Sequence, residues 1–160
     1  SKYFNMTGWR LGWMVVPEAL VPVVERLAQN LFICPSTIAQ HAALACFEDA
    51  SIALYEQRRA EFKARRDYFI PALNALGLTV PVMPDGAFYA WADCSELCQK
   101  LGIKDSWDFA FEVMNRAHVA ITPGRDFGTA QTAQFVRFST ASSMKQLETA
   151  IARLRAMLSP

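Results

Sequence analysis

A lysine and an arginine at the start of the sequence are spaced so that both could act on one ligand. Lys2 and Arg10 lie eight positions apart, with the turn-forming residue Gly8 between them. A lysine amine can attack an aldehyde, leave again and move a proton, which suits covalent catalysis. An arginine presents a planar fork of N–H donors that matches phosphate oxygens. A glycine permits the tight backbone bend that would bring both side chains to one ligand. The alternative is that Lys2 and Arg10 are ordinary surface charges.

A longer pattern surrounds these two residues. Residues 1–10 (SKYFNMTGWR) and the LGW that follows resemble the Ser-Lys-x-x-x-Met-x-Gly-x-Arg signature of the class I/II aminotransferases, which are fold-type I enzymes that carry pyridoxal 5'-phosphate (PLP) on a lysine. By this resemblance Lys2 is the catalytic residue and forms the Schiff base with PLP. Lys2 and Arg10 together then bind the cofactor, with Arg10 on its phosphate. The resemblance also implies an amino acid and a 2-oxo acid as substrates.

A second match to the same family lies far along the sequence. Residues 119–128 (VAITPGRDFG), followed by residues 135–139 (FVRFS), resemble a family segment whose arginine pairs with the α-carboxylate of the substrate, so that role falls to Arg137. Two parallel N–H to O bonds would hold an amino acid with its Cα–H bond perpendicular to the cofactor ring. The alternative is a strand arginine paired with a surface acid. Residues 86–89 (GAFY) match a family segment that approaches the substrate, although aromatic residues after a turn more often belong to a core.

The resemblance extends over essentially the whole sequence, which corresponds to the C-terminal portion of such an enzyme, starting at the catalytic lysine. We expect the chain, which begins with Ser-Lys, to be a truncated form that is inactive alone. In the family, the residues that hold the pyridine nitrogen, ring and hydroxyl of PLP lie upstream. The implied fold is α/β with an α+β small domain. Residues 1–34 end the large PLP-binding domain, and residues 35–160 form the small domain, whose mainly antiparallel sheet is covered by helices.

Hydrophobic patterns predict the elements of the N-terminal part. The apolar residues 11–16 are expected to form a short buried strand that ends at Pro17, and residues 18–30 have the spacing of a helix. Thr37 and Gln40 have capping-box spacing for the next helix. Because the strand would lack its sheet neighbours in this chain, we also expect an exposed edge, a tendency to self-associate, and weak or absent binding of PLP.

A long helical region follows, in which apolar residues share one face. Pro71 is expected to kink or interrupt this helix, and Gly77 to end it. Residues 79–83 and 87–92, on either side of a Pro-Asp-Gly turn, then predict a β-hairpin.

The last part of the sequence continues the alternation of helices and strands. Residues 106–116 predict a helix packed on the sheet, and residues 119–121 and 135–138 predict two more short strands. Ser143 is expected to open the final helix. This order of elements indicates an α+β arrangement with helices on one face of the sheet.

The composition limits the classes of partner. The 160 residues are 52% hydrophobic and carry 16 basic and 15 acidic side chains, a balance that argues against nucleic acid or an anionic membrane as a partner. No apolar run is long enough to cross a bilayer, so a soluble cytoplasmic protein is expected. The four cysteines are expected as reduced thiols. Cys94 and Cys98 lack a second pair at zinc-ligand spacing, so no metal site is expected.

Two functions remain open at this point. The first is PLP-dependent transamination by a full-length protein, which the family resemblance implies is a homodimer. The second is non-enzymatic, an aminotransferase-like module that senses a ligand or mediates association without turnover. Lys2 and Arg10 would be kept in both cases, so the sequence separates them poorly. The sequence does not identify the amino acid or the 2-oxo acid.

Overall fold

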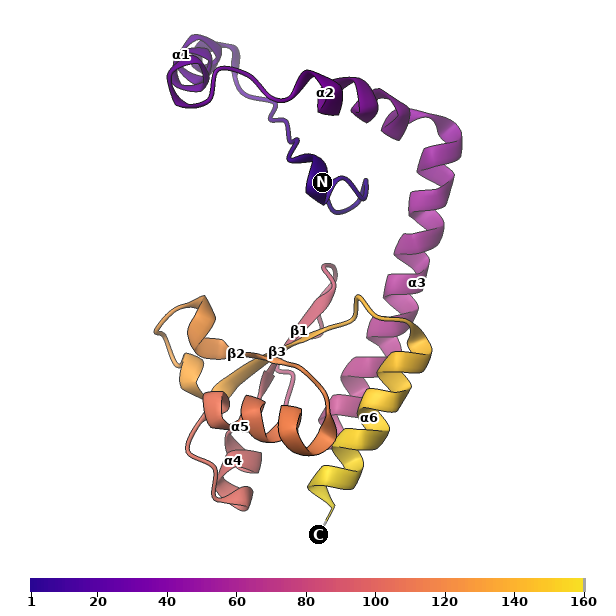
Figure 1. Ribbon diagram of the computed structural model, residues 1–160, viewed down its shortest axis with the longest axis vertical. Helices are drawn as coiled ribbons and strands as arrows, with labels where there is room; N and C mark the ends of the chain where they lie inside the picture. The colour runs from indigo at the N-terminus through magenta and orange to yellow at the C-terminus, as the bar shows by residue number, and fades with distance from the viewer. Residues whose placement is uncertain (160) are drawn as a thin grey trace. The chain divides into compact units, whose positions relative to one another are not determined.

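The structure of the protein, a computed structural model, describes residues 1–159. Its residues group into two compact units, Ser1–Ala60 and Glu61–Pro160. The boundary falls inside the long helix α3 (Asp49–Asn74), which contributes to both units (Figure 1). This grouping of contacting residues does not test the predicted domain boundary after residue 34, which stays a prediction. None of the helices within the described residues is long and apolar enough to cross a membrane.

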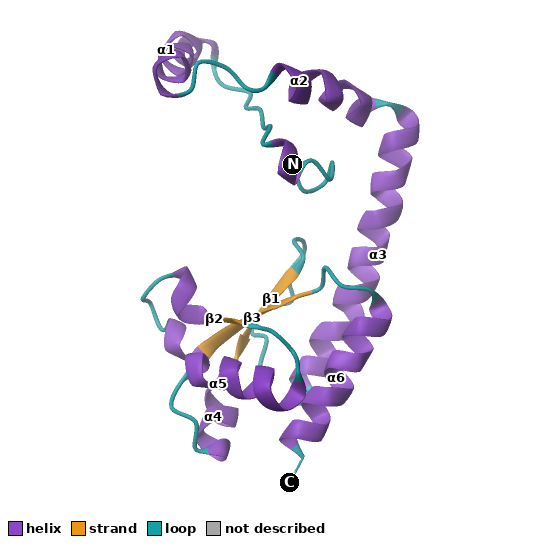
Figure 2. Ribbon diagram, viewed as in Figure 1, coloured by secondary structure: helices purple, strands orange, loops and turns teal. Residues whose placement is uncertain are grey.

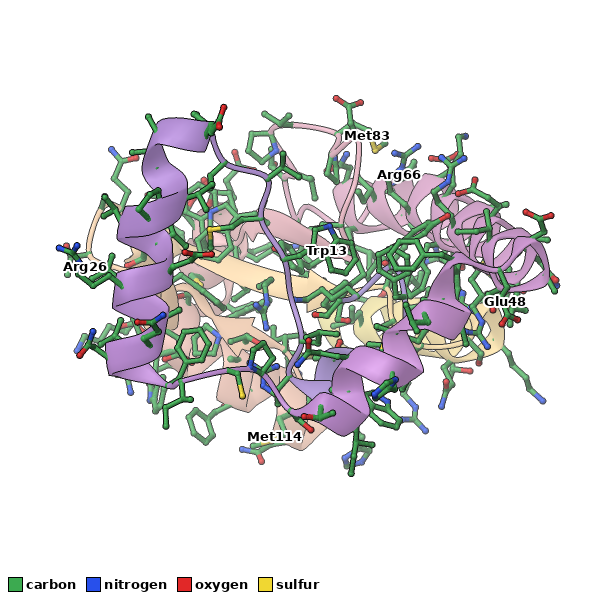
Figure 3. All side chains as sticks on the ribbon, turned by 90° about the horizontal axis from the view of Figure 1, so that it is seen from above. Trp13, Arg26, Glu48, Arg66, Met83 and Met114 are labelled. Atoms are coloured by element: carbon green, nitrogen blue, oxygen red, sulfur yellow. The ribbon has the colours of Figure 1, made fainter. Side chains whose placement is uncertain are left out.

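The first unit consists of helices and connecting segments. Its helices are α1 (Val21–Leu31), α2 (Thr37–Leu44) and the N-terminal part of α3, with 3₁₀ turns at Thr7–Trp9, Glu18–Leu20 and Ala45–Phe47 (Figure 2). A small core joins the N-terminal segment to the region from α2 to α3, and its buried side chains are Met6, Ala43, Cys46 and Tyr55. Trp13, labelled in Figure 3, packs beside this core, with its ring centroid 5.3 Å from that of Phe4 and 5.7 Å from that of Phe47.

The strand predicted for the first unit is wrong. Residues 11–16 form no strand, and the side chains of Trp13 and Val15 are 60% and 96% exposed. A strand is stable only when its N–H and C=O groups pair with a neighbour, and residues 1–60 contain no other strand with which this segment could pair. The strand edge that was expected to drive self-association is therefore absent.

The helices of the first unit begin and end near the predicted positions. The helix predicted over residues 18–30 is confirmed, as a 3₁₀ turn followed by α1, and none of the residues of α1 is buried. The predicted capping box of α2 is wrong. The N-cap residue is Ser36, whose side chain makes no capping bond, and Gln40 Nε2 donates to the Pro35 carbonyl at 3.1 Å. Because Thr37 is already helical, its hydroxyl is not at the capping position.

In the second unit, helix α3 continues through Pro71 and ends at Asn74. An interruption at Pro71 is therefore wrong, whereas the other predicted outcome, a kink, stays a prediction. Since this proline lies in the last turn, its missing N–H removes only one bond near the helix end. Gly77 terminates the helix as predicted, with a φ of +86° that glycine adopts without strain. The N–H of Leu78 then closes the turn on the carbonyl of Leu73 at 3.1 Å.

Three antiparallel strands form the sheet in the order β1-β3-β2, namely β1 (Tyr89–Asp93), β3 (Phe135–Ser139) and β2 (Thr122–Pro123). The strand predicted over residues 135–138 is confirmed, whereas the one predicted at residues 119–121 is displaced to β2. The predicted hairpin is wrong, because residues 79–83 make only an isolated bridge, at Thr79. Pro81 has no N–H to donate to a ladder, which prevents a regular strand there.

Helices cover one face of this sheet, as predicted (Figure 2). They are α4 (Ser95–Leu101), α5 (Ser106–Glu112) with the π-helical segment Val113–Ala117 that continues it, α6 (Met144–Leu158) and the end of α3. The sheet contributes four side chains to their common core, Ala90, Ala92, Val136 and Phe138. Helix α4 is absent from the predicted elements. Helix α6 has the predicted N-cap, because Ser143 Oγ accepts from the Gln146 N–H at 3.3 Å. The predicted fold class is confirmed.

Candidate functional site

Lys2 lies in a turn whose backbone is fixed by hydrogen bonds. The N–H of Asn5 donates to the Lys2 carbonyl at 3.2 Å, and the N–H of Met6 donates to the Ser1 carbonyl at 2.9 Å. Met6 is buried, and its sulfur lies 3.1 Å from the Cys46 sulfur. The Lys2 side chain is exposed and makes no ion pair within residues 1–159. Its amine is therefore available to a ligand.

The next residue, Tyr3, anchors this turn to helix α3. Its hydroxyl donates to Glu56 Oε1 at 2.7 Å, and Arg59 pairs with Oε2 of the same carboxylate at 2.5 Å. The hydrogen bond to Glu56 raises the pKa of Tyr3, whereas the donors Arg59 and Tyr3 lower the pKa of the Glu56 carboxyl. Among the described residues Glu56 forms its ion pair with Arg59, not with Lys2.

Arg10 follows the 3₁₀ turn Thr7–Trp9 in the left-handed conformation, with φ +54° and ψ +40°. Residues other than glycine seldom adopt this conformation, and it often marks a functional position. One guanidinium nitrogen, Nη1, donates to the Thr7 carbonyl at 2.9 Å, which folds the side chain back over its own turn. Arg10 pairs with no carboxylate in the part of the chain that the structure describes. Its remaining donors are free for an anion.

Gly8 does not provide the tight bend predicted for it. It lies within the 3₁₀ turn, and the positive φ angles of this segment belong to Asn5 (+53°) and Arg10 (+54°). A Cβ at Gly8 would meet no atom within 4 Å. Gly8 instead lines an open depression of about 500 Å³, whose other lining residues are Asn5, Trp9, Ser36, Ile38 and Ala39. Neither Lys2 nor Arg10 is among the residues that line this depression.

Arg137 lies in the second unit, in the middle of strand β3, and it pairs in register with Trp91 of β1 and Thr122 of β2. Its neighbours in the strand, Val136 and Phe138, are buried in the core. Because side chains alternate across a strand, Arg137 is on the sheet face that the helices do not cover. No carboxylate lies within ion-pair distance of it among the described residues, so the surface acid of the alternative interpretation is not seen.

Aromatic rings surround the Arg137 guanidinium on this face. Its Cζ atom lies over the ring of Phe127 at 4.5 Å and over the ring of Tyr89 at 5.2 Å. Trp91 stacks on Phe135 with centroids 5.4 Å apart. Aromatic residues after a turn more often belong to a core, but Tyr89 is 42% exposed and is not a core residue. Phe127 lies within the second family match but was not among the candidate site residues, because its contact with Arg137 is visible only in the structure.

Lys2 and Arg10 thus both lie in the N-terminal segment of the first unit, and Arg137 lies in the second unit. The roles expected for these three residues stay predictions. Cys94 and Cys98 lie in the core of the second unit, with sulfurs 3.8 Å apart, and all four cysteines are free thiols. Burial raises the pKa of Cys94 and of Cys98. The described residues contain no cluster of three or more side chains suited to hold a metal ion.

Comparison with known proteins identifies relatives over almost the full chain. The family model for aminotransferase class I and II matches residues 1–154. The chain is 37% identical over 158 residues to the valine–pyruvate aminotransferase of Mycobacterium tuberculosis. This match covers 99% of this chain and 39% of that protein. It is 34% identical over 154 residues to the aspartate aminotransferase of Bacillus sp. strain YM-2, covering 96% of this chain and 38% of the relative.

Solved structures give the same result. The crystal structure of an aminotransferase from Mycobacterium tuberculosis superimposes with a TM-score of 0.88 at 36% identity, covering 98% of this chain and 39% of that one. The aromatic aminotransferase from Pyrococcus horikoshii OT3 gives a TM-score of 0.83 at 33% identity, covering 99% and 41%. The chain therefore spans about two fifths of the length of its relatives. Because the family model matches nearly every residue, the chain belongs to the class I and II aminotransferases.

Proposed function

We propose that the full-length protein containing this chain is a PLP-dependent aminotransferase that moves an amino group between an amino acid and a 2-oxo acid. The observation that carries the proposal is the segment in which Lys2 and Arg10, both without a carboxylate partner in the described structure, match the family signature. The relatives compared above are all named aminotransferases, which supports this enzymatic function over a non-enzymatic module. Their names do not assign an amino acid to this chain.

The residues present fit the cofactor that the family uses. PLP is a phosphorylated aldehyde, so its site needs an amine for the aldehyde and donors for the phosphate. Lys2 offers an exposed amine, and Arg10 offers free guanidinium donors. When bound, PLP supplies an electron sink that weakens the bonds to the α-carbon of an amino acid.

Each of the three residues has a separate task in this proposal. The Nζ atom of Lys2 holds the cofactor and later carries a proton to and from the substrate carbon. The guanidinium of Arg10 binds phosphate, for which its planar fork of donors is suited. Arg137 binds the α-carboxylate of the amino acid and so orients the substrate, because two parallel hydrogen bonds fix a carboxylate in one plane.

We also propose, from the family resemblance and the composition, that the full-length protein is a cytoplasmic homodimer. The near balance of 16 basic and 15 acidic side chains gives no support for a nucleic acid or membrane partner. Size-exclusion chromatography with light scattering tests the dimer, and a monomeric mass at assay concentration would contradict it.

The experiment that tests the function uses the full-length protein and two readouts. Incubation with PLP, reduction with borohydride and peptide mass analysis should place the cofactor on Lys2, and an amino donor should convert the bound cofactor to its amino form, seen by absorbance. In the variant Lys2→Ala both signals should disappear. The exposed Lys63, which forms an ion pair with Asp67 on α3, provides the matched control Lys63→Ala. Undiminished transamination by Lys2→Ala would refute the proposal.

A further inference from the structure

Phe127 is a half-exposed aromatic residue with an unexplained position. Its ring is 46% exposed, yet the Arg137 guanidinium carbon lies over it at 4.5 Å. We propose that Phe127 is a positioning residue, whose ring holds the Arg137 guanidinium ready for a substrate carboxylate. This inference rests on the proposed role of Arg137 as the residue that binds the substrate carboxylate. It extends that role by assigning a task to Phe127.

The backbone of the turn that carries Phe127 is constrained at Gly124 and at Gly128. Gly124 starts the 3₁₀ turn Gly124–Phe127, and a Cβ there would lie 2.6 Å from the Phe135 carbonyl oxygen and in contact with that of Thr132 as well. Gly128 ends it with a φ of +134°, which side chains rarely adopt. The Thr132 hydroxyl donates to the Gly128 carbonyl at 2.8 Å. The two glycines and this bond fix both ends of the turn.

The rings restrict the guanidinium without using its hydrogen-bond donors. Phe127 and Tyr89 both lie within cation–π distance of the Arg137 Cζ atom, and Trp91 meets Phe127 edge-on at 5.5 Å. No carbonyl or carboxylate accepts a bond from the Arg137 side chain among residues 1–159. A guanidinium held in this way loses less rotamer freedom when a carboxylate binds, so the ring contact increases the affinity of the carboxylate.

The contact between Phe127 and Arg137 can be tested in the 160-residue chain by the rate at which the Arg137 side chain is chemically modified. The arginine reagent phenylglyoxal is applied with and without propionate, and peptide mass analysis gives the rate at Arg137 relative to that at the exposed Arg26 (Figure 3). In Phe127→Leu we expect Arg137 to react about two- to fivefold faster than in the wild type. We also expect that protection of Arg137 requires a concentration of propionate about two- to fivefold higher. Both changes correspond to the loss of one exposed cation–π contact.

Two further variants separate positioning from general loss of structure. Phe127→Tyr keeps the ring and should restore both values. Phe47→Leu is the control, because Phe47 is 56% exposed, lies in the first unit and contacts the rings of Phe4 and Trp13, not the turn that carries Phe127. Protection of the buried Cys94 thiol from alkylation reports that each variant is folded.

The outcomes distinguish the inference from the function on which it rests. If propionate protects Arg137 equally in the wild type and in Phe127→Leu, the positioning role of Phe127 is wrong and the carboxylate role of Arg137 stands. If propionate does not protect Arg137 in the wild type, the carboxylate role fails and the inference fails with it. Faster reaction and weaker protection in Phe127→Leu, reversed in Phe127→Tyr and absent in Phe47→Leu, support the proposal.

Discussion

Replacing Gly124 with alanine tests whether the turn that carries Phe127 depends on a close approach of backbone segments. The added Cβ would lie 2.6 Å from the Phe135 carbonyl oxygen, a distance that real Cβ atoms essentially never show, and it would also meet the Thr132 carbonyl. Neither obstacle is the flexible end of a side chain. The backbone of the turn or of strand β3 must therefore move, and Arg137 lies two residues beyond Phe135 on that strand.

Overpacking of this kind costs about 1–3 kcal/mol of the free energy of unfolding. For a unit of roughly 100 residues, each kcal/mol lowers Tm by about 4–8 °C, so a readily measured shift is expected in thermal unfolding followed by circular dichroism. Gly86→Ala is the matched control, since a Cβ at Gly86 meets nothing within 4 Å and its backbone has no positive φ. We expect its Tm to stay within about 2 °C of the wild type, as for other surface substitutions.

The same variant links stability to the site. A displaced turn would move Phe127 away from Arg137, so propionate should protect Arg137 from phenylglyoxal less well in Gly124→Ala than in Gly86→Ala. Equal Tm values for the two alanine variants would refute the argument from close approach. A lowered Tm with unchanged protection would show that the turn matters for stability and not for Arg137.

Three further measurements test other parts of the structure. Leu154→Ala, at a side chain with no exposed surface in the core of the second unit, should lower the free energy of unfolding by about 2–5 kcal/mol in urea titrations; a loss below about 1 kcal/mol would contradict the burial. Iodoacetamide at neutral pH should alkylate the exposed Cys34 and leave Cys94 unmodified, because burial raises the pKa of Cys94 and only the thiolate reacts; equal labelling would show the core is open. The folded pKa of Glu56 is lowered, so its contribution to stability is present above its unfolded pKa of about 4.3 and is lost as the pH falls through the folded pKa. Tyr3→Phe removes one donor to this carboxylate, so unfolding in urea should depend less on pH between about 7 and 3 than in the wild type, and an unchanged dependence would contradict the hydrogen bond.

Local signals in the sequence predicted much of the fold. The final helix was predicted from its own residues, since the capping bond between Ser143 and Gln146 spans three positions. The end of α3 was predicted from Gly77, because a left-handed residue at a helix end favours glycine. Strand β3 was predicted from its apolar residues, which also bury Val136 and Phe138.

The errors arose where structure depends on a distant partner. The apolar run at residues 11–16 has the composition of a strand, but a strand needs a neighbour, and the first unit contains none. The hairpin failed because Pro81 cannot join a ladder, which leaves only the isolated bridge between Thr79 and Asp93 beside β1. Lys2 and Arg10 were found as candidates from a contiguous motif. The ring of Phe127 over Arg137 joins residues ten positions apart on different elements, and no local pattern encodes that contact.

Helix α1 has a consequence for the motions of the chain. It contains 11 residues and none of them is buried, so packing adds little to its own backbone hydrogen bonds. Isolated helices of fewer than about 12–15 residues are only marginally stable in water. Amide hydrogens of α1 should therefore exchange with deuterated solvent through local opening, long before those of α6, whose inner face is buried at Leu147, Ile151 and Leu154.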